Sequence, residues 1–195
     1  MYIAKESRYD HMIYNRCGLS GLKLPAVSLG LWHNFGSTSQ FSNMREMCFT
    51  AFPFIINQNC YNIFDRTVER NGLKETAHRL GKGIICFSPL AQGLLTNRYL
   101  NGIPADSRVM TDGRFLKAEH VSEDKLRRIK ALNEIAESRG QTLAEMSVSW
   151  LLHDGIVTSV LVGASKPSQI LDNIAALKNI SFTDEELRRI DEIAL

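Results

Sequence analysis

The sequence predicts an α/β protein whose core is a parallel β-sheet. A continuous apolar run lies at residues 26–32, strand-like runs lie at 54–64 and 84–90, and a shorter apolar run begins at Val160. Such runs are typical of strands buried on both faces, as in a parallel sheet. Stretches with the apolar spacing of amphipathic helices alternate with these runs, and such helices would cover the faces of the sheet.

The first half of the chain contains a predicted hairpin, two strands and two helices. The segment from Ile13 to Pro25 alternates apolar and polar residues around two glycines, which indicates a hairpin. Pro53 ends a short helical pattern, because proline disfavours helix in the residue before it. In chain order the expected elements are the hairpin 13–25, strand 26–32, helix 40–52, strand 54–64 and helix 65–80.

The second half is mostly helical after the strand 84–90. Residues 97–120 form a polar stretch without periodicity, and loops of this length are usually functional or mobile. An apolar stripe then indicates a helix that Gly140 stops. Thr142 with Glu145, and Thr183 with Glu186, match the capping box that opens a helix. Between these two helices, a strand at Val160 leads directly into a further helix.

Composition fits one cytoplasmic globular domain. The 195 residues are 44% hydrophobic, enough to bury a core, and a net charge of +2 gives no strong field for nucleic acid or a membrane surface. Neither a signal-peptide start nor a membrane-spanning run is evident. The four cysteines show no metal-ligand or C-x-x-C spacing, which predicts reduced structural thiols and no metal. We expect one domain over 1–195, with an N-terminal part (1–52) and a C-terminal part (53–195).

Polar groups gather after three of the expected strands, where parallel α/β folds bind ligands. Glycines there allow close backbone approach, and a helix that begins after a strand offers backbone N–H groups to phosphate. These groups are Gln58 and Tyr61; the stretch Ser88 to Gly93, with Arg98 and Arg108 beyond it; and Gly163, Ser165, Lys166, Gln169 and Asn173. Together they predict a nucleotide cofactor. The ordinary alternative is that Ser165 with Pro167 is a helix start and Ser88 with Pro89 a strand exit.

Three longer stretches resemble the aldo-keto reductases, in the branch of bacterial glyceraldehyde 3-phosphate reductases and potassium-channel β subunits. "RCGLSGLKLPAVSLGLWHNFG" resembles the family's N-terminal hairpin and first barrel strand. "FSPLAQGLLTNRYLNGIPADSR" resembles its seventh strand with the cofactor-covering loop, and "VLVGASKPSQILDNI" its eighth strand and adenosine-phosphate site. The resemblance implies a TIM barrel that transfers hydride from NADPH to small aldehydes such as glyceraldehyde 3-phosphate or methylglyoxal.

The resemblance also implies a role for each matching residue. Gln58 would bind the nicotinamide amide, Tyr61 would stack on its ring, and Trp32 would border the substrate pocket. The pyrophosphate would lie against Ser88, Pro89, Leu90 and Gly93, with Arg98 and Arg108 reaching it from the loop. The adenosine end would be held by Gly163, Ser165, Lys166, Gln169, Asp172 and Asn173. Lys166 beside Ser165 suits a 2′-phosphate and favours NADP.

The chain departs from the family pattern in the middle. The family's catalytic Asp, Tyr, Lys and His belong to strands two to four, whereas here the residues before Pro53 lead straight into a stretch resembling strand six. A TIM barrel typically takes about 250 residues. We therefore expect a partial barrel with strands equivalent to 1, 6, 7 and 8, an N-terminal hairpin and C-terminal helices, with no catalytic residues and no turnover alone. The alternatives are a non-catalytic NADP-binding or partner-binding module, with a possible homodimer, or a non-functional deletion product.

Overall fold

The computed structural model describes residues 13–16, 23–26, 40, 56–100, 121–164 and 167–194. The chain divides into two compact units, Met1–Ile55 and Ile56–Leu195. The sequence placed the boundary between its two parts after residue 52. That the two parts form one domain stays a prediction.

The first unit contains the predicted hairpin. Strand β1 (Tyr14–Arg16) pairs antiparallel with β2 (Lys23–Pro25), and the backbone N–H of Ala26 donates to the carbonyl of Ile13 at 2.7 Å. The expected strand 26–32 and helix 40–52 lie outside the described residues, except for one residue at the start of each.

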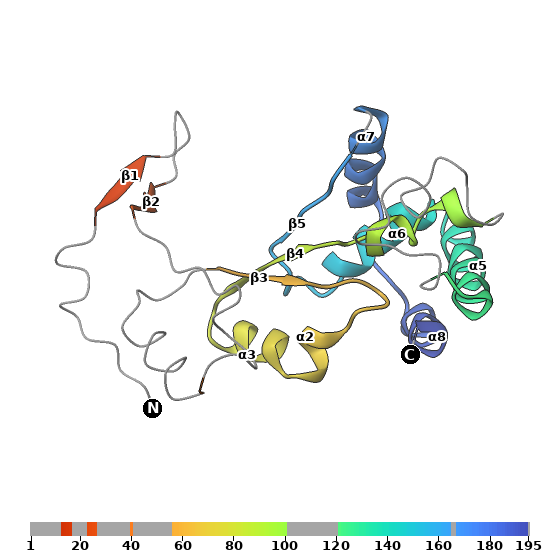
Figure 1. Cartoon of the computed structure of the whole chain (residues 1–195), viewed down its shortest axis with the longest axis horizontal. Coiled ribbons are helices and arrows are strands. Elements are labelled where there is room, and N and C mark those ends of the chain that lie inside the picture. The colour runs from red at the N-terminus through yellow and green to blue at the C-terminus, as the bar shows by residue number, and fades with distance from the viewer. Residues whose placement is uncertain are drawn as a thin grey trace. The chain divides into compact units, whose positions relative to one another are not determined.

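The second unit is built on a parallel sheet, which confirms the α/β prediction for this part of the chain. Strands β3 (Ile56–Cys60), β4 (Gly83–Phe87) and β5 (Ser159–Val160) lie in the order β3, β4, β5 (Figure 1). Strand β3 ends before the predicted residue 64 because Asn62 closes a turn, its side-chain oxygen accepting the N–H groups of Phe64 at 3.0 Å and Asp65 at 2.9 Å.

The predicted helix 65–80 is two helices. Helix α2 (Thr67–Arg70) ends at Asn71, and α3 (Leu73–Arg79) begins after Gly72. Gly72 has φ of 72°, a left-handed conformation that glycine adopts without a Cβ penalty. The side chain of Asn71 accepts the N–H of Leu73 at 3.0 Å and so starts the second helix. The helical spacing of apolar residues continues across this break, so the sequence predicted one helix.

The remaining elements follow the predicted order. Short 3₁₀ turns, η2 (Ala91–Gly93) and η3 (Asn97–Tyr99), follow β4. Helix α5 (Glu123–Ser138) ends just before Gly140, and α6 (Leu143–Leu152) follows. Helix α7 (Pro167–Ala175) continues into η5 (Ala176–Lys178), and α8 (Asp184–Ala194) ends the described chain. Within the described residues, the helices are all too short or too polar to cross a bilayer.

Both predicted capping boxes are present. The Thr142 hydroxyl accepts the N–H of Glu145 at 3.2 Å, and the Glu145 carboxylate accepts the N–H of Thr142 at 2.7 Å. Thr183 and Glu186 exchange the same two bonds before α8, at 3.2 and 2.7 Å. Each box satisfies backbone donors that the first helical turn cannot satisfy itself.

Thr142→Ala is therefore expected to lower the free energy of unfolding by about 1 kcal/mol, the usual loss for an N-cap hydroxyl. Urea unfolding followed by circular dichroism measures this loss. Thr76→Ala is the control, because Thr76 lies inside α3, where alanine is a good helix former. An equal loss in both variants would show that the cap contributes nothing of its own.

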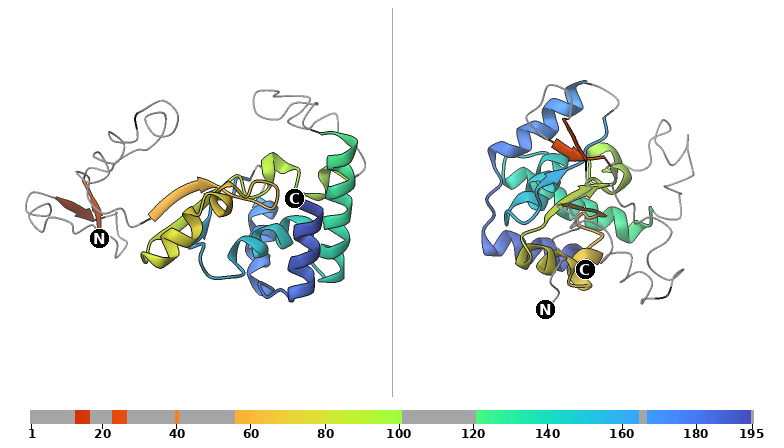
Figure 2. Two further views of the ribbon diagram at one scale, coloured as in Figure 1. Left: turned by 90° about the horizontal axis from the view of Figure 1, so that it is seen from below. Right: turned by 90° about the vertical axis from the view of Figure 1, so that its left-hand side faces the viewer.

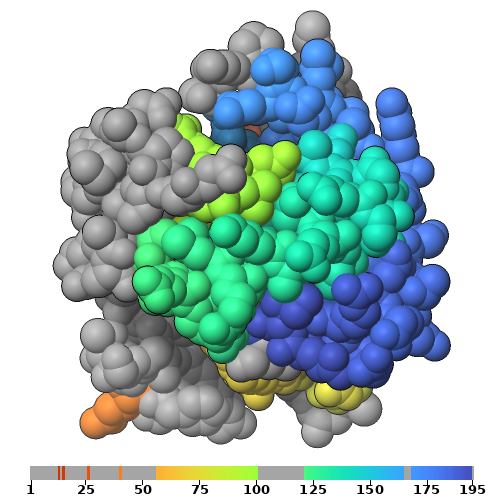
Figure 3. All heavy atoms as spheres, turned by 90° about the vertical axis from the view of Figure 1, so that its right-hand side faces the viewer, coloured from red at the N-terminus to blue at the C-terminus, as the bar shows by residue number. Residues whose placement is uncertain are grey.

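The core lies between one face of the sheet and the helices. Ile84 and Cys86 of β4 are fully buried, as are Ile129 of α5, Trp150 of α6 and Ile190 of α8. Figure 2 shows α5 and α8 side by side, and Figure 3 shows them as adjoining parts of one surface of the unit. The alternate residues of β4 point away from this core, and Phe87 at its end is 40% exposed.

Candidate cofactor site

Strands β3 and β4 bring Gln58 and Phe87 to the same sheet face. Gln58 pairs in register with Ile85, and Cys60 pairs with Phe87, so these four side chains project opposite to the buried Ile84. Gln58 and Phe87 are exposed, so an amide and an aromatic ring are both available on the open face near the carboxyl ends of the strands.

The loop after β4 has an unusual backbone. Three non-glycine residues, Ser88, Ala91 and Gln92, have φ of 55°, 47° and 61°, and Gly93 has φ of 97°. Left-handed non-glycine residues are uncommon and cost free energy, so their concentration in one loop is typical of a ligand-binding segment. The side chain of Asn62 donates to the Ser88 carbonyl at 3.0 Å, which fixes the loop to the end of β3.

A pocket of about 540 Å³ opens between the segments that follow β3 and β4. The first segment contributes Cys60, Asn62, Phe64 and Asp65; the second contributes Ser88, Ala91, Gln92 and Leu94; and Lys125 enters from α5. The pocket therefore lies at the edge of the sheet where the sequence predicted a ligand.

Burial, and then the charge of the neighbouring Asp65 carboxylate, raise the pKa of the Cys60 thiol to about 11. A thiol with so high a pKa is protonated at neutral pH and is a weak nucleophile. Among the described residues, Cys60 and Cys86 are free thiols.

Tyr61 does not lie on the open face. Its ring is fully buried, 5.3 Å from the ring of Trp150 between centroids, and its hydroxyl is hydrogen bonded to Glu69 and Lys74. Burial, followed by the hydrogen bond to Glu69, raises the pKa of this phenol well above its usual range. The ring therefore offers no face to a ligand, which corrects the stacking role expected from the resemblance. Among the described residues, Phe87 is an exposed aromatic residue at this edge.

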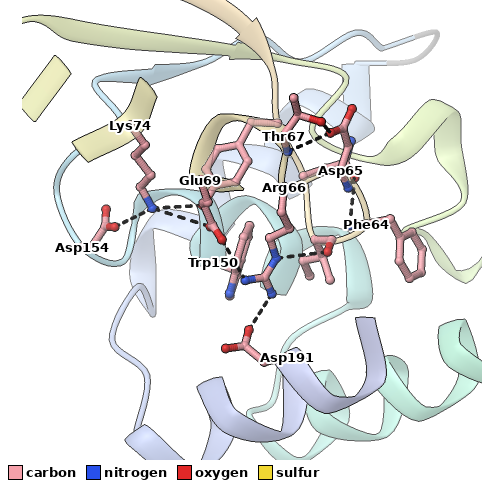
Figure 4. Close-up of polar contacts among 12 residues, drawn as sticks. Phe64, Asp65, Arg66, Thr67, Glu69, Lys74, Trp150, Asp154 and Asp191 are labelled. Atoms are coloured by element: carbon pink, nitrogen blue, oxygen red, sulfur yellow. Dashed lines mark hydrogen bonds and ion pairs between the residues drawn. The ribbon is translucent and has the colours of Figure 1, made fainter. Parts of the chain in front are cut away.

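Lys74 and Arg66 are the buried cations of a polar cluster whose carboxylates, Glu69, Asp154 and Asp191, are partly exposed (Figure 4). Lys74 donates to the Tyr61 hydroxyl at 3.0 Å and pairs with Asp154 at 2.7 Å. Arg66 pairs with Glu69 at 3.3 Å and with Asp191 of α8 at 2.6 Å, and its guanidinium lies 4.3 Å from the ring centroid of Trp150. A tyrosine that donates a proton, with a lysine and an aspartate that adjust its pKa, would use the same three residue types as Tyr61, Lys74 and Asp154. Because Tyr61 is enclosed and its pKa is raised, we assign this cluster to folding and not to catalysis.

The third predicted group lies on and before α7. Gly163, Gln169 and Asp172 are exposed, whereas Asn173 is only 8% exposed. The Asn173 amide donates to the Gln169 carbonyl at 2.7 Å, while its buried Oδ1 has no hydrogen-bond partner in the described structure. A buried acceptor without a donor costs about 1–3 kcal/mol, so Asn173 is a candidate to receive a ligand N–H group.

The remaining predicted residues are only partly placed. Ser88, Leu90 and Gly93 are half-buried in the loop after β4, Pro89 is buried, and Arg98 in η3 is exposed. Trp32, Arg108, Ser165 and Lys166 lie outside the described residues.

The sequence did not point to two further residues of the site, Phe87 and Lys125. Phe87 could have been found as the last residue of an apolar run, next to Ser88, whereas the spacing of α5 gave no signal for Lys125.

Comparison with known proteins identifies the family. Residues 26–195 match the model of the aldo/keto reductase family. The chain belongs to the aldo/keto reductase family. It is 49% identical over 143 residues to the L-glyceraldehyde 3-phosphate reductase of Escherichia coli O157:H7, and 48% identical to that of strain K12. Each match covers 72% of this chain but 41% of the relative, so the chain spans about two fifths of these reductases.

Solved aldo/keto reductases share the fold. A glycerol dehydrogenase from Gluconobacter oxydans, 27% identical, superposes with a TM-score of 0.62 over 76% of this chain and 45% of that structure. A thermostable aldo-keto reductase solved with the inhibitor epalrestat, 24% identical, gives a TM-score of 0.56 over 78% of this chain and 45% of its own. At 24% identity, the similarity to the thermostable aldo-keto reductase shows a shared fold and nothing more.

Proposed function

We propose that this chain is the cofactor-binding part of an NADPH-dependent aldo/keto reductase and does not reduce aldehydes by itself. In this proposal β3, β4 and β5 correspond to strands six, seven and eight of the family barrel. The observation that carries the proposal is the left-handed loop from Ser88 to Gly93, at the carboxyl edge of a parallel sheet and beside an open pocket.

The described residues fit the cofactor. Gln58 offers an exposed amide to the nicotinamide carboxamide, and Phe87 offers an exposed ring on the same sheet face. The Ser88 loop would lie against the pyrophosphate. The N–H groups of Ala91 and Gly93 already donate to the carbonyls of Ser88 and Leu90, at 3.0 and 2.8 Å, so the Ser88 hydroxyl is the donor that the loop would turn to the ligand. Asn173 offers an unpaired acceptor to the amino group of the adenine. When bound, NADPH supplies the hydride of the family reaction.

The proton donor is the part that we propose to be missing. Reduction of a carbonyl needs an acid close to the developing alkoxide. Lys74 and Tyr61 are hydrogen bonded, but Lys74 is only 9% exposed and Tyr61 is not exposed, so an aldehyde cannot reach them. Family resemblance assigns the catalytic tetrad to barrel strands two to four, and we propose that this chain lacks these strands. Without the tetrad, glyceraldehyde 3-phosphate and methylglyoxal should not be reduced.

Titration of the purified chain with NADPH, followed by the cofactor's fluorescence, tests binding. Gln58→Leu is expected to weaken binding about tenfold, the loss of roughly one hydrogen bond. His78→Ala, at an exposed position of α3, is the matched surface control and should bind as the unsubstituted chain does. Equal affinity in the Gln58→Leu variant and the unsubstituted chain would place the nicotinamide elsewhere.

Steady-state oxidation of NADPH with glyceraldehyde 3-phosphate or methylglyoxal tests the second half of the proposal. We expect no turnover above the rate without protein. Turnover at ordinary enzyme rates, on the order of 1 per second or faster, would contradict the loss of the proton donor.

A second candidate function is binding of a partner, including a second copy of this chain. Exposed apolar residues favour it: Ile56, Phe87 and Leu161 at the sheet, and a set on and after α7. That set is Ile170, Leu171, Ile174, Leu177 and Ile180. Light scattering across a range of protein concentrations tests self-association, and a monomer that binds NADPH normally would favour the first function alone.

A further inference from the structure

Lys125 is held at the pocket by an aromatic contact. Its ammonium lies 3.8 Å from the ring centroid of Phe64, and both residues line the pocket with Ser88. The backbone N–H of Lys125 donates to the Ser122 hydroxyl at 3.2 Å, which caps α5 and fixes where the side chain leaves the helix. The side chain is half-buried.

This position is unfavourable for a cation in the folded protein alone. Lys125 lies in the first turn of α5, where the helix dipole is positive and acidic residues are preferred. Its neighbour Asp124 pairs with Arg127 and with Arg128 instead, the latter at 2.9 Å. Burial, and then the charge of Arg128, lower the pKa of the Lys125 ammonium, although Asp124 opposes this shift.

The other charged group that lines the pocket is already occupied. The carboxylate of Asp65 accepts the N–H of Thr67 at 3.1 Å and the Thr67 hydroxyl at 2.7 Å. Burial opposes the charged form of Asp65, but these bonds, one from Cys60 and the charge of Arg70 together lower its pKa. Within the described residues, no carboxylate lies within 4.0 Å of the Lys125 ammonium. The pocket therefore presents a cation with an aromatic partner and no counter-ion there.

We propose that Lys125 binds a phosphate group in this pocket, with the Ser88 hydroxyl as a second donor. The first turn of α5 contains Glu123 and Asp124, but Asp124 is paired with Arg127 and Arg128, so a phosphate would supply the paired anion that the half-buried Lys125 ammonium lacks. Two ligands of the proposed function contain such a group: the dinucleotide, in its pyrophosphate, and a phosphorylated aldehyde. The proposal rests on the proposed function for the choice of these two ligands.

Lysine labelling tests the proposal. Pyridoxal 5′-phosphate carries an aldehyde and a phosphate, so at a phosphate site it forms an imine with a lysine amine, and borohydride then reduces this imine to a stable amine. Peptide mass spectrometry gives the extent of labelling at Lys125 and at Lys130, an exposed lysine of the same helix. We expect Lys125 to be labelled about tenfold faster than Lys130, because its pocket binds the reagent's phosphate and its ammonium loses a proton more readily.

Protection identifies the ligand. Labelling at Lys125 is measured with NADP⁺, with glyceraldehyde 3-phosphate and with unphosphorylated glyceraldehyde. Protection by NADP⁺ assigns the site to the pyrophosphate, and protection by the triose phosphate assigns it to the substrate. Equal labelling of Lys125 in all three, or labelling no faster than at Lys130, would overturn the proposal.

A variant pair separates binding from folding. Lys125→Gln should lower the affinity for the protecting ligand about tenfold, and Lys125→Arg should lower it less. Lys130→Gln should leave this affinity unchanged. Circular dichroism of all three shows whether they fold. Failure here is distinct from failure of the proposed function. If Gln58→Leu weakens NADPH binding but Lys125→Gln changes the binding of neither NADPH nor glyceraldehyde 3-phosphate, the cofactor site stands and Lys125 has no role in phosphate binding.

Discussion

Replacing Arg66 with methionine is expected to lower the free energy of unfolding by about 3 kcal/mol. Arg66 is 5% exposed and joins three parts of the unit. Its Nε donates to the Ile63 carbonyl at 3.2 Å, and its other nitrogens pair with Glu69 at 3.3 Å and with Asp191 at 2.6 Å. Methionine keeps the apolar stem over Trp150 but removes the donor to the Ile63 carbonyl and the cation paired with Glu69 and Asp191, although Glu69 keeps its bond from the Tyr61 hydroxyl. This loss of unfolding free energy is at the lower end of the range for breaking a buried ion pair, because Glu69 and Asp191 are partly exposed to water.

Urea unfolding followed by far-ultraviolet circular dichroism measures this effect. Arg79→Met is the matched control, since Arg79 is exposed in the last turn of α3, and its loss should stay within about 0.5 kcal/mol. A loss for Arg66→Met no larger than the control's would show that α8 is not joined to the sheet through this residue.

The elements that the sequence predicted well are those whose signals are local. The hairpin at 13–25 and the two capping boxes depend on residues a few positions apart, and all three are present. The alternation of apolar runs and helices likewise predicted the parallel sheet. The break at Gly72 was missed because apolar spacing continues across it, and one left-handed residue does not interrupt a periodic pattern.

Site residues were harder to predict because their roles depend on the direction of each side chain. Gln58 and Tyr61 lie three positions apart, so a strand ending between them separates their surroundings. Gln58 belongs to β3 and faces the open side, whereas Tyr61 follows the strand and turns into the core against Trp150. A tyrosine beside a strand end looks like a ligand contact in the sequence, and only packing shows that its hydroxyl is taken by Glu69 and Lys74.

The pairing of Lys74 with Asp154 predicts a pH-dependent stability. Lys74 is 9% exposed, and its ammonium lies 2.7 Å from the Asp154 carboxylate. Burial opposes the charged form of Asp154, but its bonds from Lys74 and from the N–H of Ile156 lower its pKa below the ordinary 3.8. Asp154→Asn keeps the shape and removes the charge. It should cost about 2 kcal/mol near pH 7, the worth of a hydrogen bond between charged groups.

The sign of the pH dependence follows from the lowered pKa of Asp154. In the unfolded chain the carboxylate ionises near 3.8, and in the folded chain it ionises at a lower pH, so its contribution is complete above the unfolded value. That contribution decreases as the pH falls through the folded pKa. Urea unfolding between pH 7 and pH 3 should therefore show the unsubstituted chain and Asp154→Asn converging below about pH 4. Glu134→Gln, an exposed position on α5, should show no such convergence. A constant difference between the unsubstituted chain and Asp154→Asn across this range would mean that the charge of Asp154 does not stabilise the buried ammonium.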